Sequence, residues 1–514
     1  MTARAKAPGV QRLRPGLGAL SLSLVLGALA ALGQAPWDLW YLTIPALAVL
    51  IWRMSGSGSA RATAWHAFMA GLGYFAVAMS WITEPFLVEP EVYGWMAPFA
   101  LALMAAGGAL FWTLPGWIAG RFGRSLATRA VLFATALVLS DWLRGWIFTG
   151  LPWALTGHIW INTPAGQLAA VAGSIGLSAL TMITACLPVW LRRAGPTTPR
   201  AFLPGILLSA LLIATAWSFG LARLAAPAPP DTDVHLRLVQ PNATQALKWD
   251  PYWSEVFFQR LIDLSAARDE GQAAPDAVIW PETAVNFLLD QSGDAPQQIA
   301  EVAGAPVILG IQRAQDERYF NSLTEFSSNG IGPVYDKFHL VPFGEYTPLG
   351  DVAARFGIRA FAARYGAGYS AGDGPKTMSL ANLPLVQPLI CYEAVFSRHL
   401  ITGADRPDWL LQVTNDAWFG ALSGPWQHLA QARLRAIESG LPMMRAANTG
   451  VSAVIGPRGE LRATLGLGLE GRIDASLPGH LPPTLWSRFG DWPILALMLA
   501  LALWAAARRP KLHG

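Results

Sequence analysis

The stretch Val278-Ile279-Trp280-Pro281-Glu282-Thr283 leads from a short apolar run through a proline to a carboxylate. A β-branched apolar run of this kind is typical of a buried strand, and active sites of α/β domains collect where such strands end. Two later stretches have the same character. Tyr335-Asp336-Lys337 ends in an ammonium, and Leu389-Ile390-Cys391-Tyr392-Glu393 carries a thiol after its apolar part. Residues so far apart in the chain can meet only through a folded sheet.

The three side chains complement one another chemically. A thiol is a useful nucleophile only as a thiolate, so Cys391 needs a base or a cation beside it. Glu282 can accept the thiol proton, and the Lys337 ammonium can face a developing oxyanion. Each residue alone has a plainer interpretation: a solvated glutamate, a surface lysine, a buried inert thiol. Together they predict a site for acyl transfer.

Composition places this chemistry beside a membrane. Of the 514 residues 53% are hydrophobic and 14% charged, which is too apolar for a soluble enzyme of this size. The other cysteine, Cys186, lies in an apolar stretch and is interpreted as a packing residue, not as a disulfide partner. The net charge of +4 comes from basic residues at the ends of apolar runs, which indicates no nucleic-acid role.

Eight apolar runs are candidates for membrane spans, each needing about 20 residues to cross the hydrocarbon core. Their ranges are 17–34, 41–54, 62–82, 94–118, 128–148, 164–190, 203–222 and 490–507. Lysine and arginine collect in alternate loops, so the positive-inside rule predicts that both termini are cytoplasmic. The first run could also be a signal peptide, but the regular alternation of the later loops favours a retained helix.

The chain divides into three parts on this pattern. Residues 1–222 form a transmembrane domain of seven helices, 223–489 a catalytic domain, and 490–514 the eighth helix with a cytoplasmic tail. The middle part has ordinary globular composition and is predicted on the extracytoplasmic side. Its mixed strand-like and helix-like runs indicate a layered α/β domain. Strands are predicted at Val234–Val239, Ala277–Trp280, Pro306–Ile311, Leu385–Ile390, Trp409–Val413 and Val451–Ile455, and helices at Trp253–Arg268 and Trp426–Glu438.

These motifs resemble a known family. The segments around Glu282, Lys337 and Cys391, with Val341-Pro342-Phe343-Gly344-Glu345-Tyr346, resemble the nitrilase (carbon–nitrogen hydrolase) superfamily. With eight spans around that domain, the whole chain resembles the bacterial apolipoprotein N-acyltransferase family. Further matching segments are Leu247-Lys248-Trp249-Asp250, Tyr319-Phe320-Asn321-Ser322, Asn415-Asp416-Ala417-Trp418-Phe419-Gly420 and Arg445-Ala446-Ala447-Asn448-Thr449-Gly450.

The resemblance implies an αββα sandwich with a Glu-Lys-Cys triad. In it Cys391 is the nucleophile, Glu282 the general base and Lys337 the oxyanion partner. Substrate-binding or supporting positions carried over in the same way are Trp249, Asn321, Glu345, Tyr392, Glu393, Trp418 and Arg445. No metal or cofactor is expected, because the chain has no His-Glu-x-x-His, Cys-x-x-Cys or Walker motif. His428 and Arg433 are interpreted as a packed or solvated helix face.

The resemblance also implies a reaction and its partners. A membrane phospholipid would donate an acyl chain, through a cysteine thioester, to the α-amino group of a lipoprotein's diacylglyceryl-cysteine, the last step of lipoprotein maturation. The enzyme would be a monomer in the bacterial inner membrane, with its catalytic domain on the periplasmic side. Two alternatives stay open: a membrane-tethered amidase or nitrile hydrolase that uses water as acceptor, and a transporter or scaffold with a degenerate domain.

Segment 351–376 carries a further hypothesis. Its aromatic residues Phe356 and Phe361 alternate with Arg355 and Arg359 among several glycines. Such a pattern is typical either of a membrane-touching lid or of a solvated surface loop.

Overall fold

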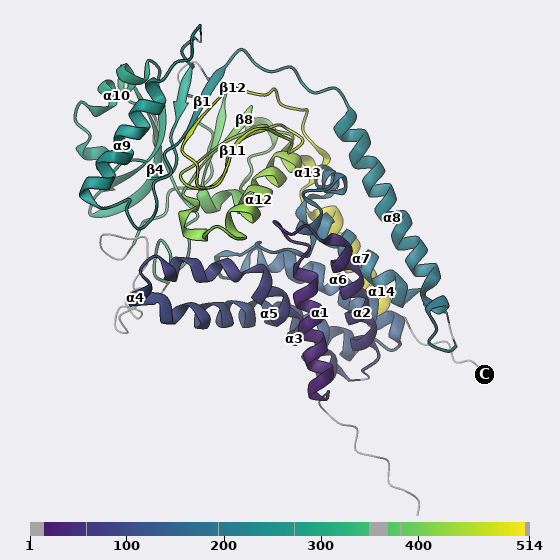
Figure 1. Cartoon of the computed structure of the whole chain (residues 1–514). Coiled ribbons are helices and arrows are strands. Elements are labelled where there is room, and N and C mark those ends of the chain that lie inside the picture. Colours follow the sequence, from purple (N-terminus) through teal and green to yellow (C-terminus); the bar gives the residue numbers. More distant parts are fainter. Residues whose placement is uncertain are drawn as a thin grey trace, which may run out of the picture.

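The computed structural model describes residues 15–57, 59–193, 195–271, 273–348, 368–380 and 383–508. Figure 1 shows a helical region from which a layered α/β domain rises, with the long helix α8 (Pro199–Ala225) along one side and a loop leading from it to the α/β domain. Most of the segment predicted as a lid, 351–367, lies outside the described residues.

All eight predicted spans coincide with helices. Besides α8, they are α1 (Leu17–Ala31), α2 (Trp40–Ser55), α3 (Ala60–Ala78), α5 (Ala97–Phe122), α6 (Leu126–Arg144), α7 (Ala169–Trp190) and α14 (Trp492–Ala507), with the single turn α4 (Pro90–Tyr93) before α5. Within the described residues, four stretches are long and apolar enough to cross a membrane: Pro90–Phe122, Leu126–Arg144, Pro164–Trp190 and Pro199–Ala225. The apolar helices α1, α2 and α14 are shorter. The count of eight spans therefore stays a prediction.

Glycines allow the helices to pack closely. A Cβ on Gly27 of α1 would lie 1.8 Å from the carbonyl oxygen of Ala70 in α3, and one on Gly73 of α3 would lie 2.0 Å from that of Leu24. Small residues at such crossings let two helix backbones touch, which is the usual way apolar helices associate without a hydrophobic driving force.

The α/β domain contains two sheets. The first has the strand order β12-β1-β2-β3-β4-β5, with β6 also paired to β4, and the second has the order β11-β10-β9-β8-β7. Strands β1, β2 and β3 run parallel, as do β7, β8 and β9. The first sheet comprises β1 (His235–Gln240), β2 (Ala277–Ile279), β3 (Val307–Gln315), β4 (Arg318–Ser327), β5 (Gly330–Ile331), β6 (Tyr335–Asp336) and β12 (Gly471–Ser476). The second comprises β7 (Val386–Ile390), β8 (Trp409–Thr414), β9 (Met443–Ala447), β10 (Ser452–Ile455) and β11 (Leu461–Leu465).

Four layers result from the packing of these sheets. Leu261 of α9 (Pro251–Ala266) and Ile299 of α10 (Ala295–Ala303) cover the outer face of the first sheet. Leu429 of α12 (Gly424–Ser439) covers the outer face of the second. The inner faces pack on each other, for example through Ile279 and Ile390. The order helix, sheet, sheet, helix agrees with the predicted α/β sandwich, and all six predicted strands and both predicted helices are present.

The two parts of the chain share one core. A single cluster of buried side chains continues from Leu26 and Tyr74 of the helical region through Trp153 and Phe419 to Ile390 of the second sheet. Helix α12 is the layer that faces the helical region (Figure 1). The short α13 (Leu485–Phe489) then leads from the α/β domain into α14.

Gln427, in the first turn of α12, joins the α/β domain to the helical region through hydrogen bonds. Its amide nitrogen donates to the carbonyl oxygens of Ala35 and Ala78, both at 3.1 Å. Its side-chain oxygen accepts the indole N–H of Trp153 at 2.6 Å. Ala35 follows α1, Ala78 is the last residue of α3, and Trp153 lies in the loop after α6. One buried amide therefore joins three separate segments of the helical region to the α/β domain.

Candidate active site

Glu282 lies just beyond the end of β2, in a turn that is tightened by the left-handed backbone of Thr283 (φ 50°). Its side chain is buried. One carboxylate oxygen accepts the side-chain amide of Asn321 at 2.7 Å, and the other accepts the backbone N–H of Asn415 at 2.8 Å. Both sheets therefore contribute to holding this carboxylate, Asn321 from the first and Asn415 from the end of β8 in the second.

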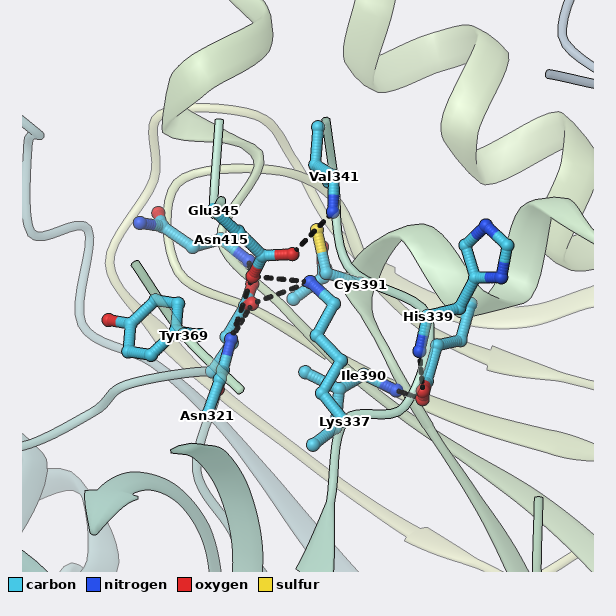
Figure 2. Close-up of polar contacts among 12 residues, drawn as sticks. Asn321, Lys337, His339, Val341, Glu345, Tyr369, Ile390, Cys391 and Asn415 are labelled. Atoms are coloured by element: carbon cyan, nitrogen blue, oxygen red, sulfur yellow. Dashed lines mark hydrogen bonds and ion pairs between the residues drawn. The ribbon is translucent and has the colours of Figure 1, made fainter. Parts of the chain in front are cut away.

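Lys337 follows β6 and is almost completely buried, with 1% of its surface exposed. Its ammonium donates to Glu345 at 2.8 Å and lies 3.4 Å from Glu282 Oε1 (Figure 2). Burial lowers the pKa of Lys337, but the neighbouring carboxylates of Glu345 and Glu282 outweigh it, and the pKa lies above its usual value. The side chain is therefore a permanent cation.

Glu345 fixes that cation in place. Its second carboxylate oxygen accepts the N–H of Val341 at 2.8 Å, and its first also accepts the amide of Asn321 at 3.1 Å. Asn321 thus bridges the two carboxylates that flank Lys337. The sequence-predicted residues Glu282, Asn321, Lys337 and Glu345 form one hydrogen-bonded cluster.

Cys391 stands at the end of β7, where the chain turns into the short helical turn η7 (Cys391–Val395). Its backbone is left-handed, with a φ of 51°, which a side chain other than glycine adopts only when its surroundings impose it. Figure 2 shows the thiol beside the Lys337 ammonium and the Glu345 carboxylate. Burial raises the pKa of the thiol, Glu282 raises it further, and Lys337 opposes them. The resting group is a thiol, so a base must remove its proton.

Glu393 ties the cysteine strand to the lysine strand. Its carboxylate accepts the backbone N–H groups of Ile390 and Phe338, both at 2.8 Å, and the hydroxyl of Tyr335 at 2.9 Å. Burial raises its pKa to about 7, against these hydrogen bonds. Its role in the structure is support of the segments that carry Lys337 and Cys391.

Tyr392 and Trp249 are two further predicted site residues. The Tyr392 hydroxyl donates to the carbonyl oxygen of Gly150 in the helical region, at 3.2 Å. Trp249 lines a small cavity beside Pro281 together with Lys248, whose ammonium is 5.7 Å from the centroid of the Trp249 ring. The same ammonium donates to the backbone carbonyl of Glu282 at 3.3 Å.

The structure places two other predicted site residues away from the cluster. Arg445 is fully buried in β9, and its guanidinium pairs with Asp416 at 2.6 Å instead of facing a substrate. Trp418, in the turn η10 (Asp416–Phe419), is partly buried against the core shared with the helical region. Arg445 supports the site from beneath.

Sequence reasoning missed three groups beside the triad. The carbonyl oxygen of Cys391 accepts the side-chain amide of Gln412 at 3.2 Å, and His428 Nε2 lies 3.1 Å from the same oxygen. Tyr369, within the described end of the predicted lid segment, donates its N–H to Glu345 O at 2.8 Å, and its ring faces the triad (Figure 2). Gln412 could have been noticed in the sequence, because it is a polar residue inside the apolar run Trp409–Val413. His428 is packed, as interpreted, and its ring contacts the backbone carbonyl of Cys391.

Two family models match the chain in succession. Residues 26–187 match the apolipoprotein N-acyltransferase N-terminal domain, and residues 252–479 match carbon-nitrogen hydrolase. An apolipoprotein N-acyltransferase of Rhodopseudomonas palustris is 36% identical over 515 residues, covering 96% of this chain and 95% of the relative. The chain belongs to the apolipoprotein N-acyltransferase family. That of Bradyrhizobium diazoefficiens is 37% identical and covers 95% of this chain and 94% of the relative.

This apolipoprotein N-acyltransferase relationship decides between the alternatives left open by the sequence. The chain is an acyltransferase enzyme of the membrane, and neither a transporter nor a scaffold. Among solved structures, a CN-hydrolase superfamily protein from Xanthomonas campestris covers 55% of this chain and 100% of its own, at 20% identity and a TM-score of 0.34. The carbon-nitrogen hydrolase match includes Glu282, Lys337 and Cys391.

Proposed function

We propose that Cys391, Glu282 and Lys337 carry the acyl transfer in two half-reactions. The Cys391 sulfur attacks an ester carbonyl of a membrane phospholipid while Glu282 accepts the thiol proton. The resulting oxyanion lies against the Lys337 ammonium. The tetrahedral intermediate collapses to a thioester, and the proton held by Glu282 goes to the leaving lysophospholipid. The α-amino group of a lipoprotein's diacylglyceryl-cysteine then attacks the thioester, forming an amide and restoring the thiol.

One observation supports these roles above the others: a left-handed cysteine faces a buried ammonium held between two carboxylates. The two carboxylates are not equivalent. Both accept a backbone N–H and the Asn321 amide, but Glu345 is closer to Lys337, at 2.8 Å against 3.4 Å for Glu282. Glu345 therefore fixes the cation, whereas Glu282 is less firmly paired with it and keeps capacity for the thiol proton. Trp249, Tyr392 and Trp418 remain proposed substrate-binding or supporting residues.

The membrane location follows from the substrates. Both carry long acyl chains, and each buried methylene favours the bilayer by about 0.8 kcal/mol, so the site must come to the lipid. We place the protein in the bacterial inner membrane as a monomer with eight spans, formed by residues 1–222 and 490–514. The catalytic domain, 223–489, would face the periplasm. The charge alternation of the loops and the helices found in all eight runs support this arrangement.

Reporter fusions test the topology. Fusions at residues 55, 124 and 196 should give a cytoplasmic signal, and a fusion at residue 300 should give a periplasmic one. A cytoplasmic signal at residue 300 would overturn the proposed orientation.

Trapping the thioester tests the mechanism. The purified full-length protein is incubated with a phospholipid mixture without acceptor peptide, digested, and analysed by mass spectrometry. The Cys391 peptide should gain an acyl mass that hydroxylamine removes, and Cys391→Ser should gain none. Cys186→Ser is the matched control, because Cys186 is the other cysteine and is buried in α7. N-acylation of a diacylglyceryl peptide by Cys391→Ser at the normal rate would refute covalent catalysis. Ammonia and free acid as products would refute the proposed transfer to an amine.

A further inference from the structure

A fully buried polar network lies beneath Cys391, on the side of the second sheet that faces α12. Gln412, Asp416, His428 and Arg445 each have 1% or less of their surface exposed. Arg445 pairs with Asp416 at 2.6 Å and also donates to the side-chain oxygen of Gln412. His428 Nδ1 lies 2.9 Å from Asp416, and its Nε2 lies 3.1 Å from the Gln412 amide nitrogen. Such a network is costly to bury unless every member is satisfied.

The charge of Asp416 decides how the protons of this network are arranged. Burial raises the pKa of Asp416, but Arg445 and His428 outweigh it and hold the pKa at about 2, so Asp416 is a carboxylate. Neutral His428 then donates from Nδ1 to Asp416, and its Nε2, which also lies 3.1 Å from the Cys391 carbonyl oxygen, accepts from Gln412. The Gln412 amide has two hydrogens, one for His428 Nε2 and one for the carbonyl oxygen of Cys391 at 3.2 Å. Because Arg445 fixes the Gln412 oxygen, the amide cannot flip.

The direction of the Cys391 carbonyl decides the direction of the next N–H. Leu411 and Val413 of β8 pack into the core between the sheets, so Gln412, between them, faces α12. The Cys391 carbonyl points toward Gln412 and therefore away from the space between the sheets. In a trans peptide the N–H points opposite to the C=O, so the Tyr392 N–H is directed back toward the side on which Lys337 lies. As the second residue of a helical turn, it has no partner within that turn.

We propose that Gln412, locked by His428, Asp416 and Arg445, is a positioning residue that orients the Cys391–Tyr392 peptide. In this orientation the Tyr392 N–H joins Lys337 in binding the oxyanion. The inference rests on the proposed thioester mechanism.

Gln412→Leu tests the proposal in the full-length protein. It keeps the shape and removes the donor to Cys391. Loss of one oxyanion donor costs on the order of a hundredfold in rate, so single-turnover thioester formation from phospholipid should fall by about that factor. Alkylation of Cys391 by iodoacetamide proceeds without an oxyanion and should keep its normal rate. Gln431→Leu is the matched control, since Gln431 is a buried glutamine of α12 that hydrogen-bonds to Gln427 O.

Two variants of His428 provide a second, independent measurement. A glutamine side chain can present an oxygen where Nε2 lies and accept from Gln412, whereas an asparagine reaches only the Nδ1 position and Asp416. His428→Gln should therefore retain thioester formation, and His428→Asn should lose it as Gln412→Leu does.

Each outcome has one meaning. Normal thioester formation in Gln412→Leu, an equal loss of alkylation and acylation, or identical rates in the two His428 variants would overturn the positioning role. Absence of a thioester in the unmodified protein would instead overturn the mechanism on which it rests.

Discussion

Removing the Lys337 ammonium should damage stability and catalysis for two separate reasons. Glu345 lies 2.8 Å and Glu282 3.4 Å from this cation, and both carboxylates share the amide of Asn321. Lys337→Met keeps the length of the side chain and leaves two buried carboxylates facing each other. One of them must then take up a proton or the site must open to water.

The two costs have similar size. Breaking a buried ion pair by removing one partner costs about 3–5 kcal/mol of folding free energy, because the other charge stays buried. Losing one oxyanion stabiliser costs about 3 kcal/mol of barrier, or on the order of a hundredfold in rate. Thermal unfolding in detergent, followed by the intrinsic fluorescence of the 23 tryptophans, measures the first. The rate of thioester formation on Cys391 measures the second.

A double variant separates them. Lys337→Met with Glu345→Gln removes the repulsion between the carboxylates, so most of the lost thermal stability should return. Thioester formation should remain about a hundredfold slow, because no cation faces the oxyanion. Glu345→Gln alone serves as the control for the second substitution. If the double variant regained the normal rate, Lys337 would serve only to neutralise Glu345, and its assignment to the oxyanion would be refuted.

Three further outcomes follow from the same geometry. Glu282→Gln should slow thioester formation sharply because it removes the base, and the rate is taken per folded protein because the new NH₂ faces a donor, the Asn321 amide or the Asn415 N–H; an unaltered rate would assign the proton to another group. Glu393→Gln should lower the free energy of unfolding by about 1–3 kcal/mol, because its new NH₂ faces donors such as the Ile390 N–H. A denaturation midpoint equal to that of the unmodified protein would contradict this. The raised pKa of Cys391 predicts alkylation that keeps accelerating above pH 9, as the thiolate fraction grows; a plateau below pH 8 would show a preformed thiolate.

The strands and the clustering of Glu282, Lys337 and Cys391 were predictable because the information is local. Apolar runs such as Ala277–Trp280 are buried wherever the sheet forms, and the polar residue after each run falls at a strand end. Glu282, Lys337 and Cys391 each follow a strand in this way. Their mutual geometry depends only on the strand ends meeting in one place.

The buried network could not be predicted in the same way. Gln412 and His428 are isolated polar residues in apolar surroundings, and their meaning depends on which strand lies beside β7 and which helix covers it. The sequence gives no order of strands in the second sheet. Arg445 was assigned to the site by resemblance, but its place beneath Cys391 depends on the parallel pairing of β8 with β9.

The attachment of α12 through Gln427 limits how this enzyme can change. A standalone amidase can be moved between genes as a module, because its surface is complete. Here, excising residues 223–489 would strip Gln427 of all three partners in the helical region and expose the face of α12 next to His428. Residues 223–489 therefore cannot be separated from the helical region without losing these contacts. A backbone shift at Ala35 or Ala78 would move α12, the helix whose His428 contacts Cys391, so substitutions in one half constrain those in the other.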